Sequence, residues 1–310
     1  MRKQPPLGFI EPLIPTLVEE PPAGEGWLHE IKHDGHRTLL IVENGTARAF
    51  TRRGHDWTSL YAPVVKEAGR LRCRAAILDG ELVVQAHDGR SDFNALRHAI
   101  HAEPHRLVFF AFDVLHLGDR DLRPAPLTDR RDLLGDLLGV RAPDSPIQFS
   151  EALEGDGAAI FAAAEGMGLE GIVSKRAASR YQSGRSTAWL KTKCMTESEF
   201  VVVGMEPNPG GAPFALLARE EEGELIYAGS AFVTLPQPER DLFWTSAEAL
   251  KMKRSAMKLG AGGRKATFVK PEMRVRAKHM RAEGMLRHAS LTALLAPRLV
   301  ERSGLNKVTA

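Results

Sequence analysis

Side chains whose types suit phosphoryl transfer are concentrated in the first two-thirds of this 310-residue chain. They occur in five short motifs, which in chain order are Lys32-His33-Asp34-Gly35, Asp79-Gly80-Glu81, Phe112-Asp113, Glu170-Gly171-Ile172-Val173-Ser174-Lys175 and Lys191-Thr192-Lys193. Each motif on its own could arise by chance. Together they supply an amine nucleophile, carboxylates, an aromatic ring and further ammonium groups, which are the groups needed to take a nucleoside monophosphate from a triphosphate.

Lys32 is the candidate nucleophile. It ends an expected strand, where alternation predicts Glu30 and Lys32 on one face and Ile31 and His33 on the other. An ammonium group cannot attack phosphorus, so the site has to favour the neutral amine, which neighbouring lysines and Mg²⁺ would do. A Lys-x-Asp-Gly string alone is more often a simple hairpin turn, so this assignment depends on the other motifs.

Charged residues in the later motifs are candidates for phosphate and metal binding. Lys191 and Lys193 lie two apart, so on a strand they share a face and can hold one phosphate chain. Glu81 and Glu170 are candidates for ribose and Mg²⁺ contacts, because Mg²⁺ keeps much of its water and needs few protein carboxylates. Arg37 is expected to return toward the pocket as a clamp. Considered alone, the lysine pair fits a basic strand edge facing water equally well, and each glutamate is more often simply an exposed acid.

Aromatic and turn residues complete the candidate site. Phe110 and Phe112 alternate on an expected strand, so one is predicted to pack in the core and the other to serve as a platform for a purine ring. Arg52 or Arg53 could reach a phosphate from an expected turn. An arginine in a turn is normally just solvated.

The elements that position these motifs are predicted from periodicity and turn residues. The first 26 residues, rich in Pro and Glu, are expected to form a loosely ordered arm before a strand at 27–32. Further strands are predicted at 38–43, 47–51, 76–84, 107–114, 171–174 and 188–191. Helices are predicted between them at 63–68, 93–101, 128–138 and 158–166.

The pattern changes after Lys193. Strands at 199–205, 214–218 and 225–229 are separated by turns rich in Gly, Pro and Glu, and one helix is predicted at 238–250. Short strands of this kind predict a small barrel, with the domain boundary between 194 and 198.

Composition and charge limit the class of protein. The hydrophobic content of 43% with 26% charged residues is typical of a folded globular protein, and no apolar run has the length of a membrane span or the pattern of a signal peptide, so a cytoplasmic location is expected. Cys73 and Cys194 are too few for a disulfide framework or a four-thiolate zinc site. The net charge is only +3, but residues 251–287 hold twelve basic residues against two acidic ones, which favours a polyanionic partner over a merely solvated face.

The full set of motifs resembles the ATP-dependent DNA ligases of the covalent nucleotidyltransferase superfamily, and most of all the bacterial end-joining type. The resemblance covers nearly the whole chain, through residues 30–37, 51–54, 78–81, 110–113, 170–175, 181, 184–186 and 189–193. It implies an α+β nucleotidyltransferase (adenylation) domain with antiparallel sheets at 1–194, followed by a small β-barrel OB-fold domain at 195–310.

The same resemblance implies an activity and its partners. The expected enzyme is a DNA ligase (ATP) that uses ATP with Mg²⁺ or Mn²⁺ to seal nicks in duplex DNA through a lysyl-AMP intermediate, in DNA repair or end joining. The implied partners are nicked or broken duplex DNA, with a Ku-like end-binding protein and a repair polymerase as candidates. The chain is expected to be a monomer without a membrane partner, in the bacterial cytoplasm and on the nucleoid when engaged.

The resemblance also implies a role for each site residue. Lys32 would form the lysyl-AMP, Glu30 would help to select adenine, and Phe112 would stack on that base. The remaining roles are ribose or phosphate contacts from Arg37 and Arg52, ribose and metal contacts from Glu81, metal assistance from Glu170, and phosphate contacts from Lys175, Lys191 and Lys193.

The last family motif is where the chain departs from the pattern. The family usually ends with Arg-x-Asp-Lys, whereas the matching place here reads Leu295-Ala296-Pro297-Arg298. This difference bears on self-adenylation, because that motif orients the pyrophosphate leaving group. Two alternatives stay open. One is an RNA ligase or capping-type nucleotidyltransferase, which shares the core motifs, and the other is a DNA-binding protein with weakened catalysis, which Leu295 and Pro297 suggest.

Overall fold

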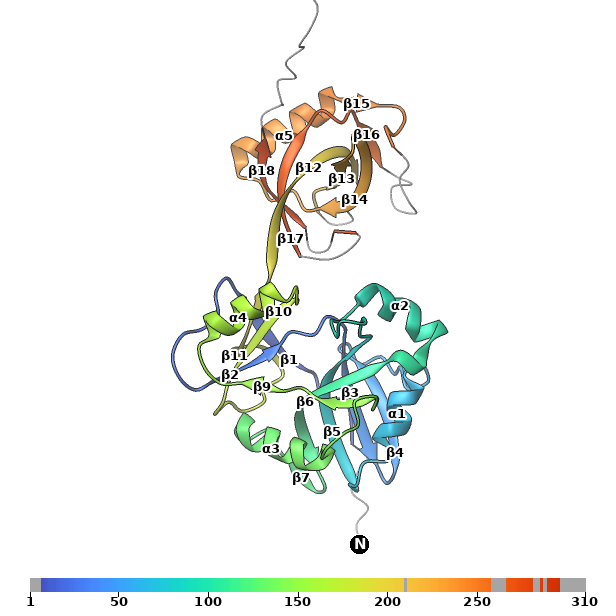
Figure 1. Cartoon of the computed structure of the whole chain (residues 1–310), viewed down its shortest axis with the longest axis vertical. Helices are drawn as coiled ribbons and strands as arrows, with labels where there is room; N and C mark the ends of the chain where they lie inside the picture. The colour runs from blue at the N-terminus through green and yellow to red at the C-terminus, as the bar shows by residue number, and fades with distance from the viewer. Residues whose placement is uncertain (1–6, 209–210, 258–265, 281–284, 287–288, 296–310) are drawn as a thin grey trace, which may run out of the picture. The chain divides into compact units, whose positions relative to one another are not determined.

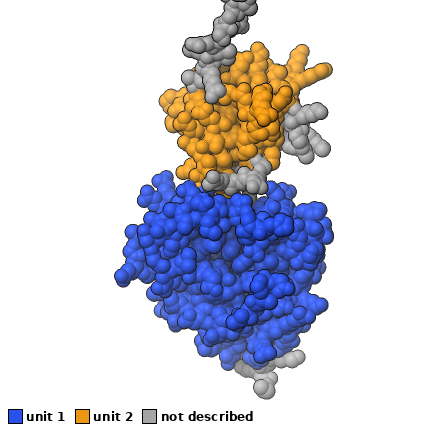
Figure 2. Space-filling model, in the orientation of Figure 1, with its two compact units in different colours: residues 1–194 blue, residues 195–310 orange. Residues whose placement is uncertain are grey.

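The computed structural model describes residues 7–208, 211–257, 266–280, 285–286 and 289–295. The chain divides into two compact units, residues 1–194 and residues 195–310 (Figure 2). In the described residues, no helix combines the length and the apolar character that crossing a membrane requires.

The first unit contains two sheets (Figure 1). One has the strand order β1-β11-β10-β2-β9, with bounds Leu13–Val18 (β1), Gly184–Lys193 (β11), Gly171–Arg176 (β10), Trp27–Ile31 (β2) and Ala152–Leu153 (β9). The other has the order β4-β3-β5-β6-β7, and β8 also pairs with β6; the bounds are Thr46–Thr51 (β4), His36–Glu43 (β3), Ala75–Val83 (β5), Val108–Leu117 (β6), Arg120–Asp121 (β7) and Ile147–Phe149 (β8). All pairings are antiparallel except β1 with β11 and β6 with β8, so the expected antiparallel sheets are present.

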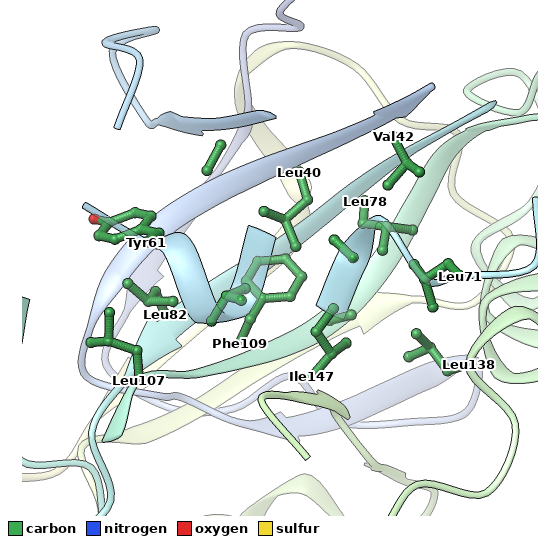
Figure 3. Close-up of a cluster of buried hydrophobic side chains, with 14 of the residues drawn as sticks. Leu40, Val42, Tyr61, Leu71, Leu78, Leu82, Leu107, Phe109, Leu138 and Ile147 are labelled. Atoms are coloured by element: carbon green, nitrogen blue, oxygen red, sulfur yellow. The ribbon is translucent and has the colours of Figure 1, made fainter. Parts of the chain in front are cut away.

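Alternate side chains of the second sheet pack on both of its faces. In β3, Leu40 and Val42 belong to one hydrophobic core, whereas Leu39 and Ile41 belong to another. Figure 3 shows members of the first core, among them Leu40, Val42 and Leu78, gathered beside β3 and β5. Helices complete this core, namely α1 (Ala62–Ala68), α2 (Phe93–Ala102) and α3 (Leu127–Leu138).

The second core of this unit joins the two sheets. It contains Leu13, Leu28 and Trp189 from the first sheet and Leu39 and Ile77 from the second. These side chains are nearly or fully buried, and each buried aliphatic side chain contributes about 1.5–3 kcal/mol to the stability of the fold. Because the cores on both faces depend on β3 and β5, these two strands form a rigid base for the site.

The N-terminal arm differs from the expectation. Instead of a loose segment, residues 13–18 form β1, which pairs in parallel with β11, a strand more than 160 residues away. Leu13 is fully buried, and its backbone N–H donates to the Tyr181 hydroxyl at 3.0 Å. A pairing partner so distant leaves no local pattern, which is why the sequence alone did not reveal this strand.

The other predicted elements of this unit are present, with ends that differ by a few residues. The predicted helix at 158–166 is α4 (Gly157–Gly166), which packs against β10 and β2. Asp92 and Asp156 cap α2 and α4, since their carboxylates accept hydrogen bonds from the N–H groups of Ala95 and Ala158.

The second unit is built around β12 (Met195–Glu206), which pairs with three strands. The sheet order is β14-β13-β12-β16-β15, and β17 pairs with both β12 and β18. The bounds are Phe214–Glu221 (β13), Glu224–Ala231 (β14), Lys251–Met252 (β15), Thr267–Val269 (β16), Arg274–Met280 (β17) and Ser290–Leu295 (β18). The predicted helix is α5 (Gln237–Ala249), whose Phe243 and Ala247 enter a core of their own with Phe200, Leu217 and Val275.

The basic segment 251–287 is less uniformly positive in the structure than its sequence suggests. Lys251 pairs with Glu248 at 2.5 Å, and Arg276 lies 3.7 Å from Glu199. Arg274 pairs with Glu220. Residues 258–265, 281–284 and 287 of this segment lie outside the described residues, as do Ala296, Pro297 and Arg298 of the last motif.

Candidate active site

One cavity of about 180 Å³ gathers most of the motif residues of the first unit. Both sheets of this unit contribute to its lining. The lining residues are Ile14, Pro15, Glu30, Ile31, Lys32, His33, Arg37, Arg52, Glu81, Phe112, Val173, Lys175, Trp189 and Lys191. Of the ten predicted site residues, eight are in this set, and the other two, Glu170 and Lys193, contact Lys32 or its partner.

Lys32 follows directly after β2, and its backbone is held in place by β10. Its N–H donates to the carbonyl oxygen of Gly171 at 2.9 Å, while its side chain reaches the cavity. Its Nζ lies 2.5 Å from Glu170 Oε2, and Lys193 Nζ lies 3.4 Å from Glu170 Oε1. The candidate nucleophile therefore has a carboxylate in direct contact, in addition to the neighbouring cations that the sequence led us to expect.

His33 does not point away from the cavity as strict alternation predicts. The strand ends at Ile31, so the chain turns and His33 joins the lining, with its ring stacked on Phe110 at 4.3 Å and 15°. Burial lowers the pKa of His33 to about 4, and the nearby ammonium groups of Lys32 and Lys175 add to this effect. The imidazole is therefore neutral at physiological pH.

Glu30 lies at the centre of a buried polar cluster. Its Oε1 accepts a hydrogen bond from Arg131 Nη1 at 2.8 Å and lies 2.5 Å from Lys175 Nζ, and its Oε2 accepts one from Ser150 Oγ at 3.1 Å. All four residues are at least 90% buried. A buried carboxylate requires such partners, because an unpaired charge in this environment is strongly destabilising.

Lys175 does not occupy the position expected from its predicted phosphate role. It is 2% exposed, and its Nζ lies 4.2 Å from the ring centroids of both Phe112 and Trp189. Burial lowers the pKa of Lys175 to about 8, although the Glu30 carboxylate opposes the change. This ammonium group therefore belongs with the aromatic wall and with Glu30 of the neighbouring strand β2, which its Nζ contacts directly.

Arg37 is held by a carboxylate behind the cavity. Its Nε and Nη2 donate to the two oxygens of Asp79 at 2.6 and 2.7 Å, and Asp79 also accepts a hydrogen bond from the Tyr181 hydroxyl at 2.6 Å. The Arg37 guanidinium lies 4.4 Å from the ring centroid of Phe112. This network joins β3 and β5 to the segment before β11, and it fixes the orientation of the Phe112 wall.

Glu81 and Glu170 are the carboxylates that could hold a divalent cation. Burial raises the pKa of Glu81 to about 8, Arg37 and Lys32 oppose the rise, and Glu170 adds to it. A cation between two carboxylates would favour their charged forms, and Mg²⁺ needs only one or two protein carboxylates besides water and phosphate oxygens. The donor set therefore fits Mg²⁺ or Mn²⁺.

The remaining cations lie beside Lys32. Burial lowers the pKa values of Lys191 and Lys193, and the positive charge of Lys32 lowers both further. Arg52, which adds to the effect on Lys191, is exposed in the turn after β4 and lines the cavity. This concentration of positive charge suits a polyphosphate.

Four residues of the site were missed by sequence reasoning. Trp189 and Tyr181 were quoted only as parts of motifs, and Asp79 only as a neighbour of Glu81, although Trp189 lines the cavity, Tyr181 packs edge-on against Trp189, and Asp79 binds Arg37. Arg131 was read only as part of a helical pattern, and no local signal marks it, because its partner Glu30 is about 100 residues away.

Comparison with known proteins identifies the family. Residues 15–193 match the sequence model of the ATP dependent DNA ligase domain. The multifunctional non-homologous end joining protein LigD of Pseudomonas aeruginosa is 40% identical over 234 residues, which are 73% of this chain and 28% of that protein. The SPbeta prophage-derived DNA ligase-like protein LigB of Bacillus subtilis is 32% identical over 200 residues, which are 63% of this chain and 72% of that protein.

A solved structure agrees with these relatives. The structure described as mycobacterial DNA ligase D complexed with ATP and MES has a TM-score of 0.56 and 29% identity, with 93% of this chain and 95% of that chain covered. The chain spans only 28% and 36% of the length of two LigD relatives. Because the family model covers more than half of the chain, and the motif residues converge on one cavity, this chain belongs to the family of ATP-dependent DNA ligase domains.

Proposed function

We propose that this chain is an ATP-dependent DNA ligase of the end-joining type, which seals nicks in duplex DNA through AMP bound to Lys32. The observation that carries the proposal is the Lys32 amine, which lines the cavity together with Lys191 and Lys175 and contacts Glu170 beside it. The mycobacterial relative of known structure was solved with ATP, which supports ATP as the substrate.

Three phosphoryl transfers make up the proposed reaction. Lys32 Nζ bonds to the α-phosphorus of ATP while the bond from that phosphorus to the pyrophosphate oxygen breaks. The AMP then passes to a 5′-phosphate of DNA, and a 3′-hydroxyl attacks that phosphate and releases AMP.

The residues around Lys32 have distinct tasks in this proposal. Glu170 is within hydrogen-bonding distance of the amine and accepts its proton, while Lys191 and Lys193 hold phosphate oxygens. When bound at Glu81 and Glu170, Mg²⁺ or Mn²⁺ would neutralise charge that develops on the phosphates.

The base is proposed to bind against Phe112, between the two sheets. Glu30 and Lys175 there present a hydrogen-bond acceptor next to a donor. Adenine has an amino donor next to a ring-nitrogen acceptor on one edge, so it matches this pair, whereas guanine has the reverse arrangement. Lys175 is accordingly assigned to the base instead of the phosphates, and Arg37 and Arg52 to the ribose or phosphates.

The second unit is proposed to be an OB-fold domain that binds DNA with the first unit as its adenylation domain. The pairing of its strands supports this assignment, because β12 pairs with three strands. In addition, Phe232, directly after β14, forms a parallel bridge to Ser290 of β18, as expected where a sheet closes into a barrel. The end-joining activity in the names of the LigD relatives supports broken DNA as a substrate. Nicked duplex DNA and a location in the bacterial cytoplasm are proposed with it. A Ku-like protein and a repair polymerase are the proposed partners.

Labelling with ATP tests this function. Incubation with α-labelled ATP and Mg²⁺, followed by peptide mapping, is expected to place the label on Lys32. Lys32→Ala should lose both the label and nick sealing while duplex binding stays nearly unchanged. Lys66→Ala, at an exposed lysine of α1 outside the cavity, is the control and should behave as the unchanged chain. Label on another residue, or sealing by Lys32→Ala, would contradict the proposed nucleophile.

A further inference from the structure

Two adjacent arginines of α3 are both buried and bind different carboxylates. Arg130 donates from Nε and Nη2 to Asp113 at 2.7 and 2.8 Å, and neither residue has any exposed surface. Arg131 binds Glu30. Neither arginine lines the cavity, yet Glu30 does.

Arg131 joins three separate segments of the first unit. Its Nη1 donates to Glu30 on β2 and also to the carbonyl oxygen of Phe112 on β6 at 3.3 Å, and its Nη2 donates to the carbonyl oxygen of Ser150 at 2.7 Å. The guanidinium also lies 4.6 Å from the ring centroid of Phe149. Ser150 in turn donates from its hydroxyl to Glu30.

These contacts set the distance between two walls of the proposed base site. Glu30 is the proposed acceptor for the adenine amino group, and Phe112 is the proposed platform for the ring. One planar guanidinium binds the carboxylate of the first and the backbone of the second, so the two cannot move independently. Arg130 offers no such link, because its other acceptors are the carbonyl oxygens of Ala125 and Ser179.

We infer that Arg131 is a positioning residue for nucleobase selection, which holds the Glu30 carboxylate and the Phe112 wall in the spacing that accepts adenine and rejects guanine. This inference rests on the proposed function. Its physical basis is that Glu30 contacts Lys175 as well as Arg131. When Arg131 no longer binds the Glu30 carboxylate, the Lys175 ammonium is the one charged partner that Glu30 keeps within the described residues. The carboxylate is then drawn toward Lys175 and away from the base.

The adjacent arginine provides a matched control for the experiment. Arg131→Lys and Arg130→Lys each keep the positive charge at a buried position of the same helix, and each removes a planar guanidinium that binds a carboxylate. The measurements are the dissociation constants for ATP and GTP, the amount of label from each nucleotide on Lys32, and the melting temperature.

Arg131→Lys is expected to weaken ATP binding at least about tenfold and to lower the preference for ATP over GTP by a similar factor, because a misplaced recognition group loses its hydrogen bonds. Arg130→Lys should lower the melting temperature comparably but keep the preference. Equal preferences in both variants, whether retained or lost, would overturn the inference and leave only a structural role for Arg131.

A second variant and a labelling control distinguish a failure of this inference from a failure to fold or a failure of the proposed function. If Arg131→Lys does not fold, Phe149→Leu, which removes the ring beside the guanidinium, takes its place with the same expectation of a reduced ATP preference. If ATP labels the unchanged chain but the variant keeps the full preference for ATP over GTP, only the positioning role fails. If the unchanged chain neither binds ATP nor takes label, the proposed function fails with it.

Discussion

At the scale of single residues, burial decides the charge of several groups around the cavity. Glu81 and His33 are both held toward their neutral forms, with pKa values of about 8 and about 4, and desolvation is the largest cause for each. Such shifts are common where a site has to bind a highly charged ligand. They also make the stability of the first unit depend on pH.

Glu81→Gln is expected to flatten that dependence. The pKa of Glu81 is raised in the folded state, so between about pH 4.5 and about pH 8 the folded chain keeps a proton that the unfolded chain releases. The contribution of Glu81 to the free energy of unfolding is therefore fully present below this window and is lost as pH rises through it. Urea unfolding from pH 5 to pH 8 should show a smaller decline in Glu81→Gln than in the unchanged chain. An unchanged slope would contradict the burial of a neutral Glu81.

At the scale of elements, β1 is the strand whose position depends most on distant contacts. It contributes Ile14 and Pro15 to the cavity, and it is attached through its pairing with β11 and through the hydrogen bond from Leu13 to Tyr181. The hydroxyl of Tyr181 also serves Asp79, which holds Arg37. One phenol group thus links the edge of the first sheet to the middle of the second.

Tyr181→Phe is expected to destabilise the chain by about 1–3 kcal/mol, since it leaves the buried Leu13 N–H and an Asp79 oxygen without that partner. It should also weaken ATP binding, because Ile14 and Pro15 lose their support. Urea unfolding and ATP titration measure the two effects. Tyr61→Phe is the control: its hydroxyl contacts His36 at 3.1 Å, away from β1, so it should lose stability without losing ATP affinity. Equal ATP affinity in both variants would argue against a role for β1 in the site.

At the scale of the whole molecule, the two units have separate cores. Every residue that lines the cavity belongs to residues 1–194. The cations of the segment 251–287 belong to the other unit. Nucleotide binding and a large share of DNA binding are therefore expected to be separable.

A fragment of residues 1–194 is expected to unfold cooperatively and to bind ATP within about threefold of the full chain, because it keeps the complete cavity and both cores of its unit. Its affinity for duplex DNA should be lower and should depend less on salt. Calorimetry and DNA titrations at several salt concentrations measure these properties. A fragment that unfolds or loses ATP would show that the second unit is needed to complete the site.

The salt dependence of DNA binding is expected to distinguish a paired cation from an exposed cation on β17. Arg274 and Lys278 lie on the same face of that strand, but Arg274 pairs with Glu220, whereas Lys278 is exposed. Lys278→Gln is expected to reduce the slope of log affinity against log salt by about one, and Arg274→Gln to change it little. The reverse result would mean that DNA displaces Glu220 from Arg274.

Local patterns in the sequence were sufficient for most elements and indicated eight residues that the structure brings together at one cavity. Strand alternation and turn residues predicted β2 to β6 and β10 to β14 within a few residues. Lys32 was predicted to be the nucleophile from its place among ordered motifs, and the structure places it at the cavity. They failed where a partner was remote: β1 pairs with β11, and Arg131 binds Glu30. They also failed at His33, where the end of a strand cancels the alternation.

Amino-acid types and their order thus determined which chemical groups this chain can bring to a nucleotide, because nucleophile, carboxylates and lysines are properties of side chains. Only the tertiary structure decided which groups contact one another. Lys175 shows the difference: the family resemblance implied a phosphate contact, but in the structure its ammonium contacts Glu30 and lies close to two aromatic rings. Burial and distance, which set charge and hydrogen bonding, exist only after strands far apart in the chain have paired.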